Sequence, residues 1–315
     1  MGGILAWAES GTLAPEELRR AAALAPLAPD SADWRIAADR LLAFAGILLL
    51  ATGLVFFFAY NWDDLHRYAK LGLAWSALCA CVVAALFAQP FATWYRAALL
   101  GAAVATGVLL ALIGQTYQTG ADLWELFAAW LVLMTPFALL ARSSATWLLW
   151  AVLANLALGR YLSTSNWFGW FGVLSGPEGL YLIAAGNLIL LLGFESLARG
   201  LLVAPRRHVQ RLLALGVIAP LAIGAGIAWW DEDYRVLTPA FFVLGALACW
   251  FYRDRRRDVP ILAMAVFAAI AVLTLGLVRL IPDDFFAYNL VALFVIACTG
   301  YAAVWLMRLM QREAA

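Results

Sequence analysis

Residues 111–130, ALIGQTYQTGADLWELFAAW, contain the point where one long apolar segment gives way to the next. The first run ends at Ile113, and Leu126 lies well inside the second. The residues between them form a polar patch whose members are Gln115, Thr116, Tyr117, Gln118, Thr119, Asp122 and Glu125. An ionisable side chain that reaches hydrocarbon is costly and normally marks a cavity or a partner. A search for a functional site therefore starts at this patch.

The composition around the patch is that of a membrane protein. Of the 315 residues, 65% are hydrophobic and only 13% are charged, and the mean hydropathy is +0.87. A soluble core of this length would not hide so much apolar surface. The composition therefore predicts an all-α, polytopic α-helical membrane protein.

A helix that spans the bilayer needs about 20 mainly apolar residues, because each residue advances the helix by about 1.5 Å. Ten such segments can be placed in the sequence. Their approximate limits are 41–60, 69–88, 97–114, 122–141, 145–161, 178–198, 210–230, 236–252, 260–281 and 286–307. We therefore expect about ten transmembrane helices, of which 145–161 is the weakest because it is short and contains Asn155.

The first 40 residues differ from the rest of the chain. Pro15 suits the first turn of a helix, and Asp30 followed by Ser31 can cap the start of a second one. We expect residues 1–40 to form a cytoplasmic or interfacial helical segment and residues 41–315 to form the transmembrane domain.

The basic residues divide unevenly between the two sides of this arrangement. Of the 21 Lys and Arg residues, all but Arg67, Lys70, Arg160, Arg235 and Arg279 fall on the side of the N-terminus. Cytoplasmic loops carry an excess of Lys and Arg. The count therefore predicts a multi-pass protein of the bacterial inner (cytoplasmic) membrane with both termini in the cytoplasm.

The loops on the opposite side are acidic and aromatic, and they supply the candidate substrate-binding residues. Aromatic side chains at this depth are expected in any membrane protein, but that belt does not account for the acids. Asp122 and Glu125 would share one face of a helix. The candidates are Asn61, Trp62, Asp63, Asp64, His66, Lys70, Gln115, Tyr117, Gln118, Asp122, Trp124 and Glu125.

Two of these groups have alternative interpretations. Asp63, Asp64 and His66 would be able to exchange protons as an acid/base set, or they would form an ordinary solvated turn. Lys70 is the only lysine in the chain. We expect a compact cation at this position to pair with Asp122 or Asp63, with chance retention of the lysine as the alternative.

The sequence predicts neither a metal site nor a cofactor. His66 and His208 lie far apart, and the four cysteines sit inside apolar runs without CxxC spacing. The chain has no GxSxG, HExxH or Walker loop, which removes common enzyme routes.

Other charged residues have simpler interpretations. We expect Glu195 to snorkel or to pair with Arg199, four residues on. We expect the basic clusters 205–208 and 253–257 to set the orientation of the chain in the membrane, with contact to anionic lipid as the second interpretation. We expect no nucleic-acid partner.

Two stretches, VFFFAYNWDDLHRYAKLGL (55–73) and IGQTYQTGADLWELFAAWLVLMTP (113–136), resemble the bacterial membrane family called domain of unknown function 2157 (DUF2157). The segment WAESGTLAPEEL (7–18) resembles the helical lead-in of that family. The matching positions are Asn61, Trp62, Lys70, Gly114, Gln115, Tyr117, Gln118, Leu126, Phe127, Trp130 and Pro136. The resemblance covers about residues 5–140. It implies an uncharacterised inner-membrane protein and lends no established catalytic residues.

Three functional classes remain open. In the first, which we favour, a periplasm-facing polar and aromatic pocket binds or transports a small polar or anionic solute. In the second, a membrane-embedded enzyme acts on a lipid-linked or periplasmic substrate with Asp63, Asp122 or Glu125 as general base. In the third, the aromatic face is a scaffold that docks a membrane or periplasmic partner protein. The lipid bilayer is a partner in all three.

Overall fold

The computed structural model describes residues 31–60, 65–118, 120–163, 176–203, 207–281 and 285–314. These residues are helical or lie in short connections, and none of them forms a β-strand. Ten of the helices are long and apolar enough to cross a membrane. The prediction of an all-α membrane protein with about ten spans is confirmed.

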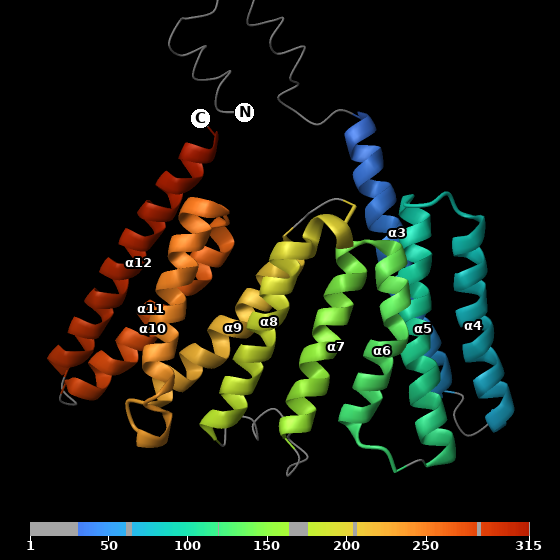
Figure 1. The fold of residues 1–315 in the computed structure, drawn as a ribbon, viewed down its shortest axis with the longest axis horizontal. Helices are drawn as coiled ribbons and strands as arrows, with labels where there is room; N and C mark the ends of the chain where they lie inside the picture. Colours follow the sequence, from blue (N-terminus) through green and yellow to red (C-terminus); the bar gives the residue numbers. More distant parts are fainter. Residues whose placement is uncertain are drawn as a thin grey trace, which may run out of the picture. The chain divides into compact units, whose positions relative to one another are not determined.

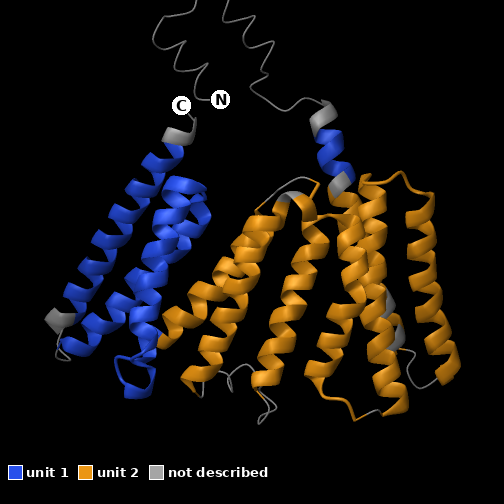
Figure 2. Cartoon of the chain, viewed as in Figure 1, with its two compact units in different colours: residues 1–39, 225–315 blue, residues 40–224 orange. Residues whose placement is uncertain are grey.

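The chain divides into two compact units, which are coloured separately in Figure 2. Unit 2 comprises Arg40–Gly224, and unit 1 comprises Met1–Asp39 and Ala225–Ala315. Each unit has its own packing and is described by itself.

Successive helices of unit 2 run in alternating directions, as Figure 1 shows. They are α3 (Ser31–Tyr60), α4 (Arg67–Phe87), α5 (Thr93–Tyr117), α6 (Leu123–Ala141), α7 (Ser144–Leu162), α8 (Pro177–Leu201) and α9 (His208–Ile227), the last of which continues past the unit's end. The α5–α6 end is where α4 begins, α5 ends and α6 begins, and the α6–α7 end is the opposite one.

The first helix differs from the sequence prediction. We expected a short helix starting near Asp30 and a separate span from residue 41, but α3 is one continuous helix of 30 residues. No proline interrupts the sequence from Ser31 to Tyr60, so the backbone hydrogen bonds continue without a break.

Helix α5 is the buried centre of unit 2. It packs against α4 and α6, and many of the side chains that it buries are small, among them Ala97, Gly101, Ala102 and Ala103. Small residues let the backbones of neighbouring membrane helices approach closely. Because α5 packs against helices on several sides, the polar patch begins at the end of a well-packed helix.

The contact between α5 and α6 includes a tryptophan that lies directly on a glycine. The indole of Trp130 occupies the space above Gly107, so that a Cβ atom added to Gly107 would overlap the ring. The indole Nε1 donates a hydrogen bond of 2.7 Å to the backbone oxygen of Ala103, four residues before that glycine. Shape and hydrogen bonding together therefore define how α5 and α6 pack.

Unit 1 contains the helices α10 (Leu237–Trp250), α11 (Val259–Leu280) and α12 (Phe285–Ala314). A short 3-10 turn, η2 (Glu232–Tyr234), precedes α10, and a π-helical turn, η3 (Phe251–Arg255), follows it.

The same tryptophan-on-glycine contact occurs in unit 1. Trp229 lies on Gly276 of α11, and its Nε1 donates a hydrogen bond of 3.1 Å to the backbone oxygen of Val272. This acceptor again lies four residues before the glycine. In each unit, therefore, a tryptophan ring from one segment packs against a glycine of a neighbouring helix.

Candidate functional site

The α5–α6 end of unit 2 holds every candidate site residue that the structure describes. These are His66, Lys70, Gln115, Tyr117, Gln118, Asp122, Trp124 and Glu125. The candidates Asn61, Trp62, Asp63 and Asp64, and Thr119 of the polar patch, lie outside the described residues. The site is therefore built here from three segments: the start of α4, the end of α5 and the start of α6.

His66 is the N-cap residue of α4. Its ring nitrogen Nδ1 accepts a hydrogen bond of 3.4 Å from the backbone amide of Tyr68. Side chains at this position satisfy amides that the helix itself leaves without a partner. The ring is exposed, so the residue contributes to the start of the helix and to the surface of the site at once.

Lys70 is buried, with only 8% of its surface exposed. It lies one helical turn before Ala74, which packs against Leu109 and Leu112 of α5. Lysine is almost never buried in proteins without compensating interactions. The structure therefore places a cation at the edge of the apolar contact between α4 and α5.

Thr116 lies on the corresponding edge of α5, one turn beyond Leu112. The hydroxyl Oγ1 of Thr116 is buried and, among the described residues, has no hydrogen-bond partner. Helices α4 and α5 run antiparallel, and Ala74 of α4 contacts Leu112 of α5. One helical turn further toward the α5–α6 end, the next positions are Lys70 on α4 and Thr116 on α5, which therefore lie at the same level along the two helices.

Five other helical threonines of the described chain differ from Thr116 in how their hydroxyls are satisfied. They are Thr52, Thr106, Thr135, Thr274 and Thr299, and each donates to the backbone oxygen four residues earlier. Such a bond satisfies a hydroxyl that has no water around it. Thr116 departs from this pattern, and it does so at the site.

The end of α5 is a tight turn that presents polar side chains. Gln118 adopts a left-handed backbone conformation with φ of 44°, and Gly120 follows with φ of 67°. A left-handed glutamine is uncommon, whereas a glycine adopts this conformation without steric cost. Gln115, Tyr117 and Gln118 are all exposed at this turn.

Asp122 and Glu125 meet at the start of α6. The Glu125 carboxylate accepts a hydrogen bond of 3.2 Å from the backbone amide of Asp122, and the Asp122 carbonyl accepts one of 3.0 Å from the amide of Glu125. This arrangement is one half of a capping box. Both acids are exposed, so Glu125 helps to start its helix, while an ion pair between Asp122 and Lys70 stays a prediction.

Trp124 connects the site to α7. Its ring contacts the ring of Tyr161 edge to face, with the centroids 5.2 Å apart. The sequence singled out Trp124 but not Tyr161, which is exposed at the end of α7. An aromatic wall therefore borders the α5–α6 end on the side of α7.

A second polar group lies away from this end, inside the membrane-spanning part of unit 2. The amides of Asn155 on α7 and Asn187 on α8 exchange two hydrogen bonds, of 3.0 and 2.6 Å. Each amide nitrogen also donates to the backbone oxygen four residues earlier in its own helix. Asn187 is almost fully buried and lies directly against Gly216 of α9. This closed pair has the character of a structural joint between helices.

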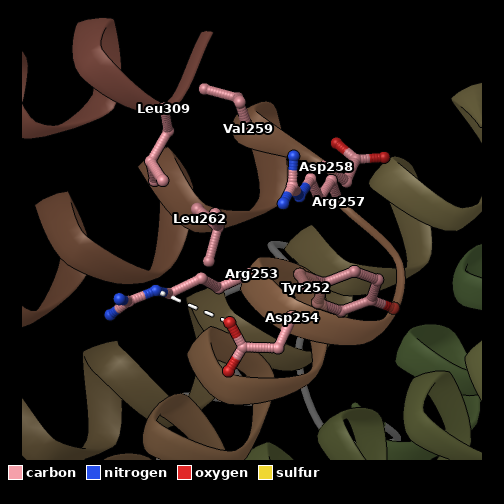
Figure 3. A pocket seen from close by; sticks show the side chains of 8 residues that line it. All are labelled: Tyr252, Arg253, Asp254, Arg257, Asp258, Val259, Leu262 and Leu309. Atoms are coloured by element: carbon pink, nitrogen blue, oxygen red, sulfur yellow. Dashed lines mark ion pairs between the residues drawn. The ribbon is translucent and has the colours of Figure 1, made fainter. Parts of the chain in front are cut away.

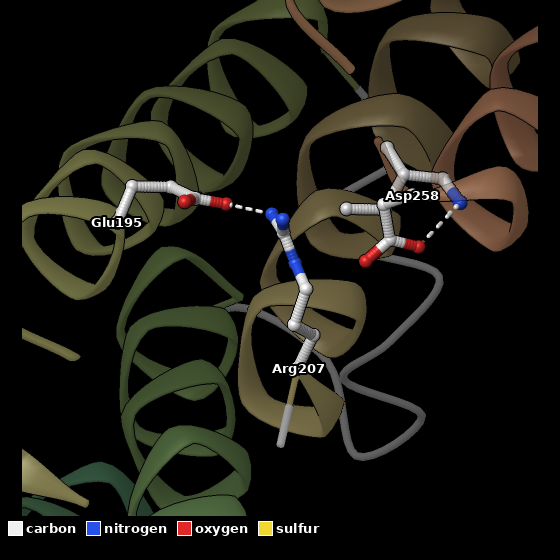
Figure 4. A network of polar contacts seen from close by, with 4 residues as sticks. Glu195, Arg207 and Asp258 are labelled. Atoms are coloured by element: carbon white, nitrogen blue, oxygen red, sulfur yellow. Dashed lines mark hydrogen bonds and ion pairs between the residues drawn. The ribbon is translucent and has the colours of Figure 1, made fainter. Parts of the chain in front are cut away.

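Glu195 pairs with Arg207, which we did not expect from the sequence, whereas the expected pair with Arg199 stays a prediction because the Arg199 side chain lies outside the described residues. Figure 4 shows the Glu195 carboxylate pointing toward the Arg207 guanidinium. Glu195 is 8% exposed, so the arginine helps to neutralise a buried carboxylate at the α6–α7 end. Arg207 follows the end of α8 in the sequence, so the spacing of residues within α8 does not predict this pair.

The chemistry available at the α5–α6 end is that of polar recognition. It combines a buried ammonium, a buried hydroxyl, two exposed amides, a phenol, an imidazole and two exposed carboxylates, of which that of Glu125 is bonded to the backbone. In the part of the chain that the structure describes, no three His, Cys, Asp or Glu side chains gather so that they would hold a metal ion.

Searches of curated proteins and of solved structures each found no match to the chain. A search of family models did find one, and it includes α4, α5 and α6 with the whole α5–α6 end. This match confirms the resemblance that the sequence motifs suggested. Residues 5–147 of the chain match the family described as predicted membrane protein (DUF2157).

Proposed function

We propose that this membrane protein binds a small anionic solute at the α5–α6 end, as the recognition step of its transport. The observation that supports this most strongly is the buried hydroxyl of Thr116, which lacks a hydrogen-bond partner within the described chain at the same level as Lys70. A buried polar group without a partner is costly and needs an explanation, and a ligand that supplies the missing bond is the one that we propose.

The residue types favour an anion. The ammonium of Lys70 supplies positive charge, and the Thr116 hydroxyl is free to rotate and donate to a carboxylate or phosphate oxygen. Gln115, Gln118 and Tyr117 add donors at the mouth of the site. Glu125 is engaged at the backbone of its own helix, which argues against its use as a general base and so favours binding over catalysis.

The proposed setting is the bacterial inner membrane, with both termini in the cytoplasm. The support is the distribution of arginine, which is concentrated at the opposite side from Lys70. In this orientation the α5–α6 end faces the periplasm and meets solutes before they cross.

Thr116→Val tests the proposal because it separates stability from binding. Valine fills the same space without a hydroxyl, so the variant should be at least as stable as the parent, by about 1 kcal/mol if the whole penalty of the buried hydroxyl is relieved. Anion affinity should nevertheless fall about threefold to tenfold, the contribution of one hydrogen bond. Thermal unfolding in nanodiscs of zwitterionic lipid, with inorganic phosphate, acetate or succinate added, measures both quantities.

Thr106→Val is the matched control, since Thr106 lies on the same helix but donates to Ala102. It should lose about 0.5 kcal/mol of stability and keep the full response to the anion. The proposal is wrong if none of the three anions stabilises the parent, or if Thr116→Val responds to them as the parent does.

A further inference from the structure

Unit 1 contains a pocket of about 120 Å³ between η3, α11 and α12. Figure 3 shows its walls, which combine charged side chains from the connection between α10 and α11 with apolar side chains from the helices. The residues that matter here are Arg253, Asp254, Arg257, Val259, Leu262 and Leu309.

The charged wall is shaped by the π-helical turn η3. The backbone amide of Arg256 donates to the oxygen of Phe251, five residues earlier, at 3.0 Å. Such turns are rare and occur frequently at functional sites, because the wider helix redirects side chains. Here the turn carries Arg253 and leads directly to Arg257.

The pocket has two acids beside its two arginines, but both acids are engaged elsewhere than with Arg257. Asp258 is almost fully buried, and its carboxylate caps α11 by accepting from the amide of Ile261 at 3.4 Å. Asp254 pairs with Arg253 at 3.6 Å between exposed side chains, an interaction that contributes little in water. Arg257 is exposed and has no acidic partner among the residues that the structure describes.

The opposite wall of the pocket is apolar. Val259 and Leu262 come from the first turn of α11, and Leu309 comes from the last part of α12. The surrounding surface has the features of a membrane interface, because Trp250 is 54% exposed and the Arg255 guanidinium lies 6.0 Å from the centre of its ring.

We propose that this pocket binds one anionic phospholipid. Its phosphate would lie between Arg253 and Arg257, and its glycerol and first acyl carbons would contact Leu262 and Leu309. Arginine recognises phosphate through paired, charge-assisted hydrogen bonds, and basic pockets between membrane helices on the cytoplasmic side bind anionic headgroups. The pocket places an incompletely neutralised pair of arginines beside an apolar wall. A lipid fits this combination better than a free anion does, because only a lipid has an apolar part that contacts the wall.

The experiment is native mass spectrometry of the full-length protein with phosphatidylglycerol or with phosphatidylcholine. The parent should retain one phosphatidylglycerol molecule preferentially, and Arg253→Gln with Arg257→Gln should weaken that binding about tenfold or more. The matched control is Arg255→Gln with Arg256→Gln, which removes the same charge from the same turn but leaves the pocket wall intact. It should weaken binding by less than about threefold.

Leu309→Trp keeps the test valid if the arginine variant fails to fold. It fills the apolar side without a change of charge and should also reduce lipid retention. Equal losses in the two double variants would mean diffuse attraction to the surface and would overturn the proposal. So would equal binding of the two lipids, or competition by inorganic phosphate at the same concentration as the lipid.

Discussion

Gly107→Ala should destabilise the protein by about 3 kcal/mol, a large fraction of the total stability of a marginally stable domain. The added Cβ would overlap the Trp130 indole, and the ring cannot swing away without losing its 2.7 Å hydrogen bond to Ala103. Gly193→Ala is the control, because the space around Gly193 in α8 is open. Alanine there should stabilise the helix by about 0.5–1 kcal/mol.

The measurement is unfolding of the purified variants by heat or by increasing denaturing detergent. Trp130→Ala should destabilise on its own, but in the Gly107→Ala background its further effect should be much smaller, because the two changes remove the same contact. Additive effects would show that the glycine and the tryptophan act separately. Gly276→Ala should reproduce the defect in unit 1, where Trp229 takes the place of Trp130.

Asn187→Leu should cost about 2–4 kcal/mol, because it leaves the Asn155 amide in an apolar region without its partner. The two amides exchange two hydrogen bonds between α7 and α8, and Asn187 is only 2% exposed. Removing both amides should be less harmful than the sum of the single changes, since no unsatisfied group is then left behind.

A double-mutant cycle with Asn155→Leu and Asn187→Leu measures this coupling in the same unfolding assay. The expected coupling is about 1–2 kcal/mol, the upper part of the range for hydrogen bonds between membrane helices. A coupling near zero would mean that the amides are satisfied separately by their own backbones, through the bonds to Ala151 and Ile183.

The architecture was predictable because it depends on local quantities. A run of about 20 apolar residues specifies a membrane helix wherever it occurs. The structure accordingly contains the expected ten long apolar helices, including the weak segment with Asn155, which is α7. The continuity of α3 was missed, because a change from polar to apolar residues is not by itself a helix break.

The contacts between helices were not predictable in the same way. Trp130 and Gly107 are 23 positions apart, and no spacing rule connects them. Arg207 as a partner of Glu195 was not predictable for a related reason, since the expectation used spacing within one helix and the structure supplies Arg207 from the following turn. Asn187 did carry a signal, as a lone amide in the apolar run LIAAGNLILL.

The candidate site was predictable from the sequence only in part. The polar patch was visible in the sequence, and eight of the twelve candidate site residues lie among those described, all at the α5–α6 end. The burial of Lys70 and the missing partner of the Thr116 hydroxyl became evident only with the packing of α4 against α5. These are the two features on which the proposed function depends.

Acylation of Lys70 is the measurement that tests the solute site most directly, because Lys70 is the only lysine and is 8% exposed. A membrane-impermeant amine reagent should modify it from the periplasmic face of spheroplasts and not from that of inverted vesicles. The reaction should be slow, and inorganic phosphate or succinate should slow it further. The reference is the lysine introduced by Arg67→Lys in a Lys70→Met background, exposed on the same helix, which should react quickly with or without the anion. Modification of Lys70 from the cytoplasmic face, or at the rate of that exposed lysine and unaffected by either anion, would contradict the account.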